Sequence, residues 1–144
     1  MKTLLAVLAL LLGLNRTALA QKEKIEGTWM SEEKNAKVLI YKANDGKFWG
    51  KIVWLAEPMK DGKPKVDEKN PKAALRNTPL MNYPLLRHFK KDSETSFDGG
   101  EIYDPKNGKT YSCTITVRNA NELGIRGYMG ISLLGRTTTW TRSE

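Results

Sequence analysis

Apolar and polar residues alternate with a period of two over most of the chain after residue 20, and this pattern constrains the fold more than any other feature. The alternation is clearest in residues 109–117, where hydroxyl-bearing residues separate Tyr111, Cys113, Ile115 and Val117. Successive side chains of a β-strand point to opposite faces, so such a segment forms a strand with one buried face. Gly, Asn or Asp interrupts the pattern repeatedly, as the turns of an all-β protein require.

The expected strands cover residues 27–31, 37–42, 47–55, 102–103, 109–117, 122–129, 131–134 and 136–142. In the second of them, Val38 and Ile40 share one face. In the third, the alternation places Phe48, Ile52 and Trp54 on the core face, and in the sixth it places Leu123, Ile125 and Met129 inward. Asp45-Gly46, just before that strand, is a strong hairpin signal, because a type I′ turn needs positive φ at both central residues. About eight antiparallel strands predict a single up-and-down β-barrel, since closure removes exposed sheet edges. A two-sheet sandwich is the alternative.

The alternation is lost between residues 56 and 96, where five prolines break the chain. Asn70-Pro71 reads as the N-cap and first-turn proline of a short helical piece that extends to Arg76. A second, apolar piece contains Leu80, Met81, Tyr83, Leu85, Leu86 and Phe89. A loop with so many large apolar residues is not expected to be disordered. We therefore expect this long excursion to pack on the barrel, across one end or against a wall.

The first twenty residues have the layout of a secretory signal peptide, with Lys2, an apolar run and the sequence Ala18-Leu19-Ala20. We expect cleavage after Ala20 and a periplasmic or secreted protein. A membrane anchor would need about 20 apolar residues, which this run does not reach. Residues 21–144 are sufficient for one domain and too few for two ordinary ones.

The chain is basic, with a formal net charge of +8, and it stays basic without Lys2 and Arg16. Such a charge favours anionic partners, for example lipid head groups or cell-wall polymers, although scattered lysines that only keep the protein soluble explain it equally well. Export argues against a nucleic-acid partner. Cys113 is the only cysteine, so an intramolecular disulfide is impossible. On the inward face of its strand, it is expected to be a buried and unreactive thiol.

Two segments at opposite ends of the domain carry a resemblance. Gly27-Thr28-Trp29 resembles the G-x-W signature of lipocalins and related calycin barrels, in which the tryptophan plugs one end. In an antiparallel barrel the last strand lies beside the first, so Arg142 can stack on Trp29, with Arg136 as a second candidate. The resemblance therefore implies a lipocalin-like barrel closed by an arginine on a tryptophan.

A closer resemblance covers nearly all of residues 21–144. The chain is similar to the family of exported bacterial proteins catalogued as domain of unknown function 2147. The most specific stretches are Gly100-x-Ile102-Tyr103-Asp104-Pro105, Gly108-Lys109-Thr110-Tyr111, Arg126-Gly127-Tyr128, Gly135-Arg136 and Trp140-x-Arg142. Phe97 departs from the family, whose members tend to carry tryptophan there. The resemblance implies a lipocalin-like barrel outside the cytoplasm, and it implies no activity.

The sequence offers little for catalysis. His88, the only histidine, has no serine, cysteine or carboxylate at the spacing of a catalytic motif. One histidine and one inward cysteine do not supply the usual four ligands of a zinc site. We therefore expect no catalytic residue, no metal site and no cofactor. Asp67 and Asn70 precede the expected helical piece, where capping is the preferred role and contact with a ligand or cation the alternative.

These features predict a non-catalytic binding module, for which two interpretations remain. In the first, the barrel carries a small apolar or anionic amphipathic ligand and the excursion acts as a lid. In the second, bulky side chains fill the barrel and the basic surface docks on envelope lipids, glycans or a protein. A monomer is expected in both. For the carrier, Arg136 is the candidate for an acidic head group, and the residues expected to line the interior are Phe48, Ile52, Trp54, Ile115 and Trp140.

Overall fold

The structure is a computed structural model that describes residues 21–131 and 135–144. The expected signal peptide at residues 1–20 lies outside the described residues. So do residues 132–134 of an expected strand, whose first residue, Ile131, is exposed in a bend. In the described part of the chain, no helix is long and apolar enough to cross a membrane.

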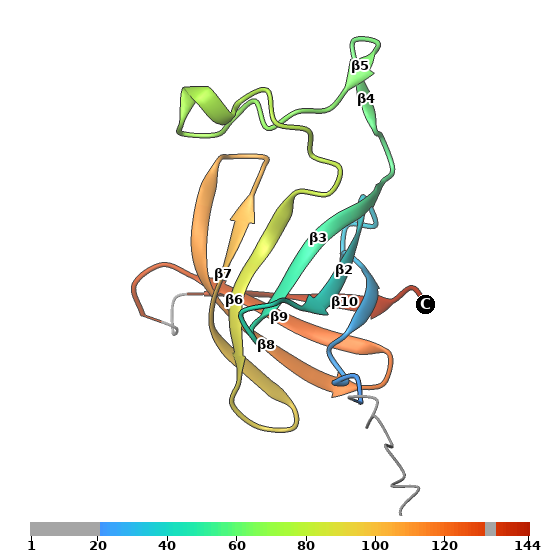
Figure 1. Cartoon of the computed structure of the whole chain (residues 1–144), viewed down its shortest axis with the longest axis vertical. Coiled ribbons are helices and arrows are strands. Elements are labelled where there is room, and N and C mark those ends of the chain that lie inside the picture. The colour runs from blue at the N-terminus through green and yellow to red at the C-terminus, as the bar shows by residue number, and fades with distance from the viewer. Residues whose placement is uncertain (1–20, 132–134) are drawn as a thin grey trace, which may run out of the picture.

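Eight antiparallel strands close into one barrel, which confirms the predicted architecture and excludes the sandwich (Figure 1). The order around the barrel is β1-β10-β9-β8-β7-β6-β3-β2, so the first and last strands are neighbours. The strands are β1 Gly27–Met30, β2 Ala36–Lys42, β3 Phe48–Leu55, β6 Pro84–Lys91, β7 Ser96–Asp104, β8 Lys109–Asn119, β9 Glu122–Tyr128 and β10 Arg136–Arg142.

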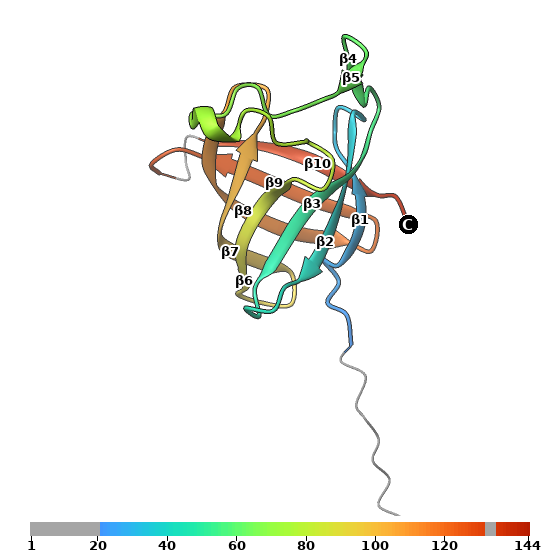
Figure 2. The same cartoon turned by 45° about the horizontal axis from the view of Figure 1, so that its top comes forward.

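The excursion leaves the barrel after β3 and lies above one end of it (Figures 1 and 2). It contains a small hairpin, β4 Met59–Lys60 and β5 Lys63–Pro64, and one short 3-10 helix, η1 Ala73–Leu75. The expectation that Asn70 caps a helix is wrong, because Lys72 occupies the N-cap position of η1. The Asn70 side-chain oxygen instead accepts a hydrogen bond from the Lys72 backbone N–H at 2.8 Å.

The expected excursion is too long, because Pro84–Lys91 within it form the barrel strand β6. Two irregularities hide this strand from a period-two analysis. The pairing of β3 with β6 shifts register twice, and His88 adopts a φ of 65° within the strand. As a result Leu85 and Leu86 are both buried although they are consecutive. A β-bulge of this kind depends on the partner strand, so it leaves no local signal in the sequence.

The predicted inward faces are confirmed wherever the pairing is regular. Val38, Ile40, Cys113, Ile115 and Val117 are all buried. Consequently the strand register deduced from alternation is the observed one for most of β2 and β8.

Two residues expected to point inward do not. Trp54 is 39% exposed, so the prediction that it faces the interior is wrong. In the pairing of β2 with β3, Lys37 is opposite Trp54 and Val38 is opposite Ile52, which leaves Val53 as an extra residue. This bulge turns Trp54 outward. Met129 is 58% exposed because it follows the end of β9 at Tyr128.

Large side chains fill the half of the barrel nearer to Trp29. Phe48 and Phe97 pack edge to face, with ring centroids 5.1 Å apart. Two glycines make room for their neighbours: a Cβ on Gly100 would lie 2.5 Å from the Phe89 ring, and one on Gly50 would lie 2.8 Å from Leu86. This half of the interior is therefore a packed core rather than a cavity.

The same end of the barrel is closed by the tryptophan and arginine that the resemblance implies. Trp29 is fully buried, and its indole N–H donates a hydrogen bond to the Ile25 backbone oxygen at 2.9 Å. The Arg142 guanidinium lies 4.1 Å from the centre of the Trp29 ring. That guanidinium also donates hydrogen bonds to the backbone oxygens of Ala120, Glu26 and Lys24 at 2.7, 3.1 and 2.9 Å. The alternative partner, Arg136, lies at the opposite end of β10.

Candidate functional site

The opposite end of the barrel is open and leads into a cavity of about 860 Å³. The loops β1–β2 and β7–β8, the start of β10 and part of the excursion surround its mouth. The apolar residues of its floor and walls project from six barrel strands and the excursion. They are Val38, Ile52, Leu55, Leu80, Leu85, Ile102, Ile125 and Trp140.

The mouth, in contrast, carries charges of both signs. Four acidic residues, Glu32, Glu33, Glu57 and Asp104, and four basic residues, Lys34, Lys65, Lys106 and Arg136, line it. The cavity is therefore amphipathic, with an uncharged interior and an electrically balanced rim.

One ion pair spans the mouth, from Glu33 in the β1–β2 loop to Lys106 in the β7–β8 loop. The hydrogen bond from Lys106 and its charge lower the pKa of Glu33, and the charge of Arg136 lowers it further. Glu33 thus partly neutralises Arg136 as well as Lys106. The neighbouring Glu32 accepts a hydrogen bond from the Thr139 backbone N–H at 2.6 Å, which fixes the β1–β2 loop against β10.

The six residues expected to contact a ligand divide into three groups. Ile52 and Trp140 line the cavity, and Arg136 lies exposed at its mouth. Phe48 and Ile115 are buried, but they belong to the filled half and do not line the cavity. Trp54 lies on the outer wall.

Several residues of the cavity were not predicted from the sequence. Leu80 and Leu85 line it, yet they lie in the segment assigned to the excursion. Leu55 lines it because the bulge at Val53 exchanges the faces of β3 beyond that point. The only available signal was the apolar character of residues 80–89, which indicated packing on the barrel without showing where.

A buried polar cluster holds the excursion against the barrel next to the cavity. Asp67 is fully buried, and its carboxylate accepts hydrogen bonds from the Tyr103 hydroxyl at 2.6 Å and from the Asn70 amide at 2.8 Å. Burial, and then the hydrogen bond to Asp67, raise the pKa of Tyr103 above its usual range. The Arg87 guanidinium lies over the rings of Tyr83 and Tyr103, at 5.8 and 5.5 Å. Asp67 therefore has an anchoring role, which neither of the two roles considered from the sequence describes.

The remaining reactive side chains lie away from the cavity lining. Cys113 is buried, as predicted, and burial raises the pKa of its thiol to about 12. His88 packs edge to face against Trp49, with ring centroids 4.3 Å apart. In residues 21–131 and 135–144, no group of three or more His, Cys, Asp or Glu side chains is arranged to hold a metal ion.

Comparisons with known proteins agree with this architecture. The chain is similar to the solved structure of HP1028 from Helicobacter pylori, which is described as belonging to the lipocalin family. The TM-score is 0.75 and the sequence identity is 27%, over 85% of each chain. No curated protein matches the sequence. Residues 27–142 match the family described as "Uncharacterized protein conserved in bacteria (DUF2147)", and the chain therefore belongs to that family.

Proposed function

We propose that the protein is an exported, non-catalytic carrier of a small amphipathic molecule. The observation that carries this proposal is the cavity, which is apolar inside and charged at its mouth. Its volume of about 860 Å³ falls within the range of small-molecule sites. The likeness to a lipocalin supports a binding role over a catalytic one. The layout of residues 1–20 supports export.

The apolar tail of the ligand contributes more to affinity than its head group. Each methylene group buried in the cavity contributes about 0.8 kcal/mol, which is about a fourfold gain in affinity. An ion pair between a carboxylate and the exposed Arg136 contributes at most about 1 kcal/mol, or about fivefold. Glu33 beside Arg136 reduces this further. A fatty acid therefore fits the site, with its head at Arg136, and tail length controls binding.

The proposal is tested with protein recovered from the periplasm or the medium, whose N-terminus is first sequenced and is expected to be Gln21. Fatty acids of increasing length and the alcohols of equal length are then titrated, with Trp140 fluorescence as the reporter. Replacing Trp49 and Trp54 by Phe removes the tryptophans of the outer wall. We expect saturable binding that strengthens with chain length. In an Arg136→Gln variant, the acids should bind more weakly by less than about fivefold and the alcohols should bind unchanged.

Two neighbouring substitutions on β10 provide the control for location. Thr138 lines the cavity, whereas Thr137 is exposed on the outer face of the same strand. Thr138→Phe reduces the cavity and is expected to weaken binding, whereas Thr137→Phe leaves binding unchanged. The absence of any saturable response, or equal binding by the two variants, would show that the cavity is not a ligand site.

A further inference from the structure

Acidic residues are absent from five neighbouring strands of the barrel. The strands β10, β1, β2, β3 and β6 lie side by side and together contain eight lysines and arginines and no Asp or Glu. All acidic residues of the barrel strands lie in β7 and β9. The barrel strands are therefore divided into a set whose own charged residues are all basic and a mixed set, a distribution that the net charge alone does not reveal. Carboxylates of the loops lie at the margins of the first set, for example Asp45, which accepts hydrogen bonds from the Trp49 indole N–H at 3.1 and 3.3 Å.

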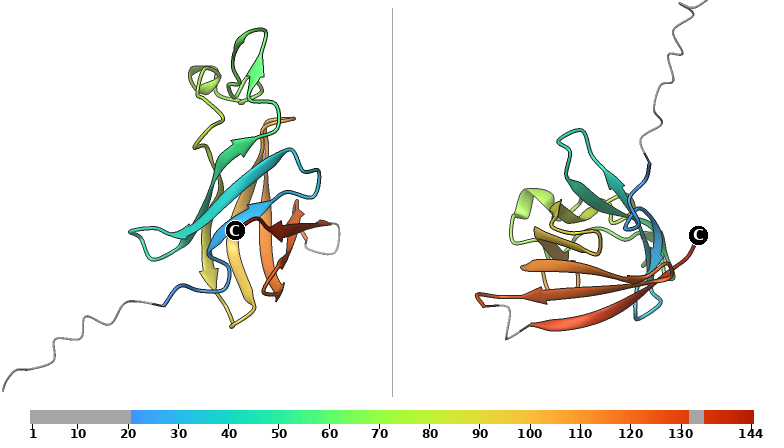
Figure 3. Two further views of the ribbon diagram at one scale, coloured as in Figure 1. Left: turned by 90° about the vertical axis from the view of Figure 1, so that its right-hand side faces the viewer. Right: turned by 90° about the horizontal axis from the view of Figure 1, so that it is seen from below.

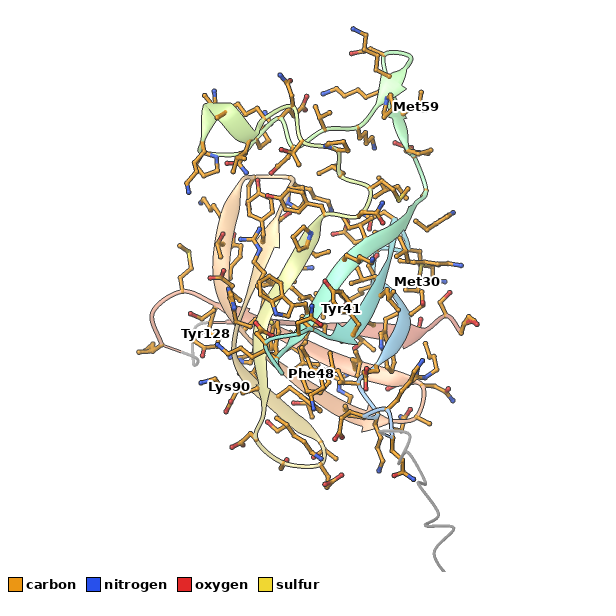
Figure 4. All side chains as sticks on the ribbon, viewed as in Figure 1. Met30, Tyr41, Phe48, Met59, Lys90 and Tyr128 are labelled. Carbon is orange, nitrogen blue, oxygen red and sulfur yellow. The ribbon has the colours of Figure 1, made fainter. Side chains whose placement is uncertain are left out.

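The basic set also carries apolar side chains on its outer surface. Trp29, Val38, Ile40 and Ile52 point inward, so the residues between them point outward. We call this surface the β1–β3 face. Figure 3 (left) shows its three strands crossing in front of the barrel, and Figure 4 labels Met30 and Tyr41 on it. Its apolar and aromatic residues are Met30, Leu39, Tyr41, Trp49, Val53 and Trp54, all half-buried or exposed.

Two lysines of this face extend along its aromatic rings. The Lys37 ammonium lies 5.4 Å from the centre of a Trp54 ring, and the Lys51 ammonium lies 5.6 Å from the centre of the Tyr41 ring. In the described residues, neither ammonium forms a salt bridge.

Two basic residues on the neighbouring strand β6 behave differently. Lys91 forms salt bridges with Glu23 and Glu94, and the Arg87 guanidinium lies 3.7 Å from the Glu101 carboxylate. Lys90, exposed on β6, forms no salt bridge among the described residues either. What distinguishes Lys37 and Lys51 is that their uncompensated charges lie beside the apolar residues of β1–β3.

We propose that the β1–β3 face docks on the surface of an anionic phospholipid bilayer. Tryptophan and tyrosine side chains are favoured at the membrane–water interface, where one side of the ring is apolar and the other is wet. Lysines next to them reach the phosphates while their methylene stems cover apolar surface. A nucleic acid would use the charges and leave Met30, Leu39 and Val53 without a partner. The combination of uncompensated lysines with aliphatic and aromatic residues matches a lipid surface.

Docking in this orientation brings the cavity close to the lipid. Trp54 lies on the β1–β3 face, and the next residue, Leu55, lines the cavity. The β1–β3 face runs from Trp54, beside the mouth, to Tyr41 and Trp49, near the plugged end, so docking brings one edge of the mouth to the lipid. Membrane binding itself does not depend on the proposed carrier function, because it uses the outer wall.

Vesicle flotation tests the proposal, with phosphatidylcholine vesicles compared with vesicles that also contain phosphatidylglycerol. The double variant Lys37→Gln/Lys51→Gln is compared with Lys63→Gln/Lys109→Gln, which removes the same charge from exposed positions outside the face. We expect binding to the anionic vesicles only, weakened by salt. The affinity of Lys37→Gln/Lys51→Gln for the vesicles should fall about thirtyfold, which is the contribution expected of two lysines at an anionic membrane surface. The affinity of Lys63→Gln/Lys109→Gln should stay within about threefold of that of the unmodified protein.

A second measurement tests insertion of the apolar residues. Brominated phosphatidylglycerol should quench the fluorescence of bound protein, and a Trp54→Ser variant should lose most of this quenching while keeping its far-UV spectrum. The proposal would be overturned if the two double variants lost affinity equally, or if the protein bound neutral and anionic vesicles with the same affinity. It would also be overturned if Trp54→Ser left the quenching unchanged.

Discussion

The closed end of the barrel permits a quantitative prediction for Trp29→Ala. The indole is fully buried, it donates one hydrogen bond to the Ile25 carbonyl, and it stacks under the Arg142 guanidinium. Removing a large aromatic side chain from a core costs about 3 to 5 kcal/mol of unfolding free energy, which includes the cavity that remains. Loss of the partner of a buried carbonyl adds about 1 kcal/mol. We therefore expect a loss near the upper limit, about 5 kcal/mol.

A loss of this size is comparable with the whole stability of a small domain, which is about 5 to 15 kcal/mol. Because a loss of this size leaves little folded protein for a melt, Trp29→Phe provides a second measurement. Phenylalanine keeps an aromatic ring for Arg142 and removes the indole N–H, so we expect a smaller loss of about 1 to 2.5 kcal/mol.

Urea denaturation followed by far-UV circular dichroism measures both variants without relying on the mutated fluorophore. A double-mutant cycle with Arg142→Lys isolates the stacking, because lysine keeps the charge and loses the planar guanidinium. The expected coupling is about 0.5 to 2 kcal/mol. If Trp29→Ala costs less than about 1 kcal/mol, as surface substitutions do, Trp29 does not close the barrel and the reasoning fails.

Two further predictions concern buried polar and thiol groups. Tyr103→Phe removes the hydroxyl that donates to the buried Asp67 carboxylate, and it should lower the free energy of unfolding by about 1.5 to 3 kcal/mol. The control Tyr111→Phe, at a half-buried position, should lower it by less than about 0.5 kcal/mol in the same urea melts. Equal costs would show that the cluster does not anchor the excursion. Burial raises the pKa of the Cys113 thiol to about 12, so the thiol should react with a maleimide at pH 7 only after unfolding. Rapid labelling of the native protein would contradict the inward position of Cys113.

Alternation predicted strands and their faces reliably where two strands pair without interruption. Cys113, Ile115 and Val117 on β8 are buried as predicted. The prediction was wrong at Trp54, where a single extra residue in β3 exchanges the two faces of the strand. Bulges arise from how two distant segments fit together, so local sequence does not specify them.

The candidate site was predictable to a similar extent. Ile52, Trp140 and Arg136 were expected to face the interior or its rim, and they lie along the cavity and its mouth. Leu80 and Leu85 were missed because their position depends on how the excursion returns to the barrel. The anchoring of Asp67 by Tyr103 was also missed, since 36 residues separate the two in sequence and only the closed barrel brings them together.

Whether bulky side chains fill the barrel is a question that counting them does not answer. Phenylalanines and the Trp29 plug fill the closed half: Trp29, Phe48, Phe89 and Phe97 lie there, and Gly50 and Gly100 make room for their neighbours, whereas Trp140 and two tyrosines line the cavity. The open half is lined mostly by aliphatic residues, and an unfilled apolar cavity forfeits the contacts that its lining would otherwise make. The closed half must therefore supply the stability that keeps the open half available for a ligand. On this argument, substitutions at the plug change the free energy of unfolding, and substitutions at the mouth change binding with little effect on folding.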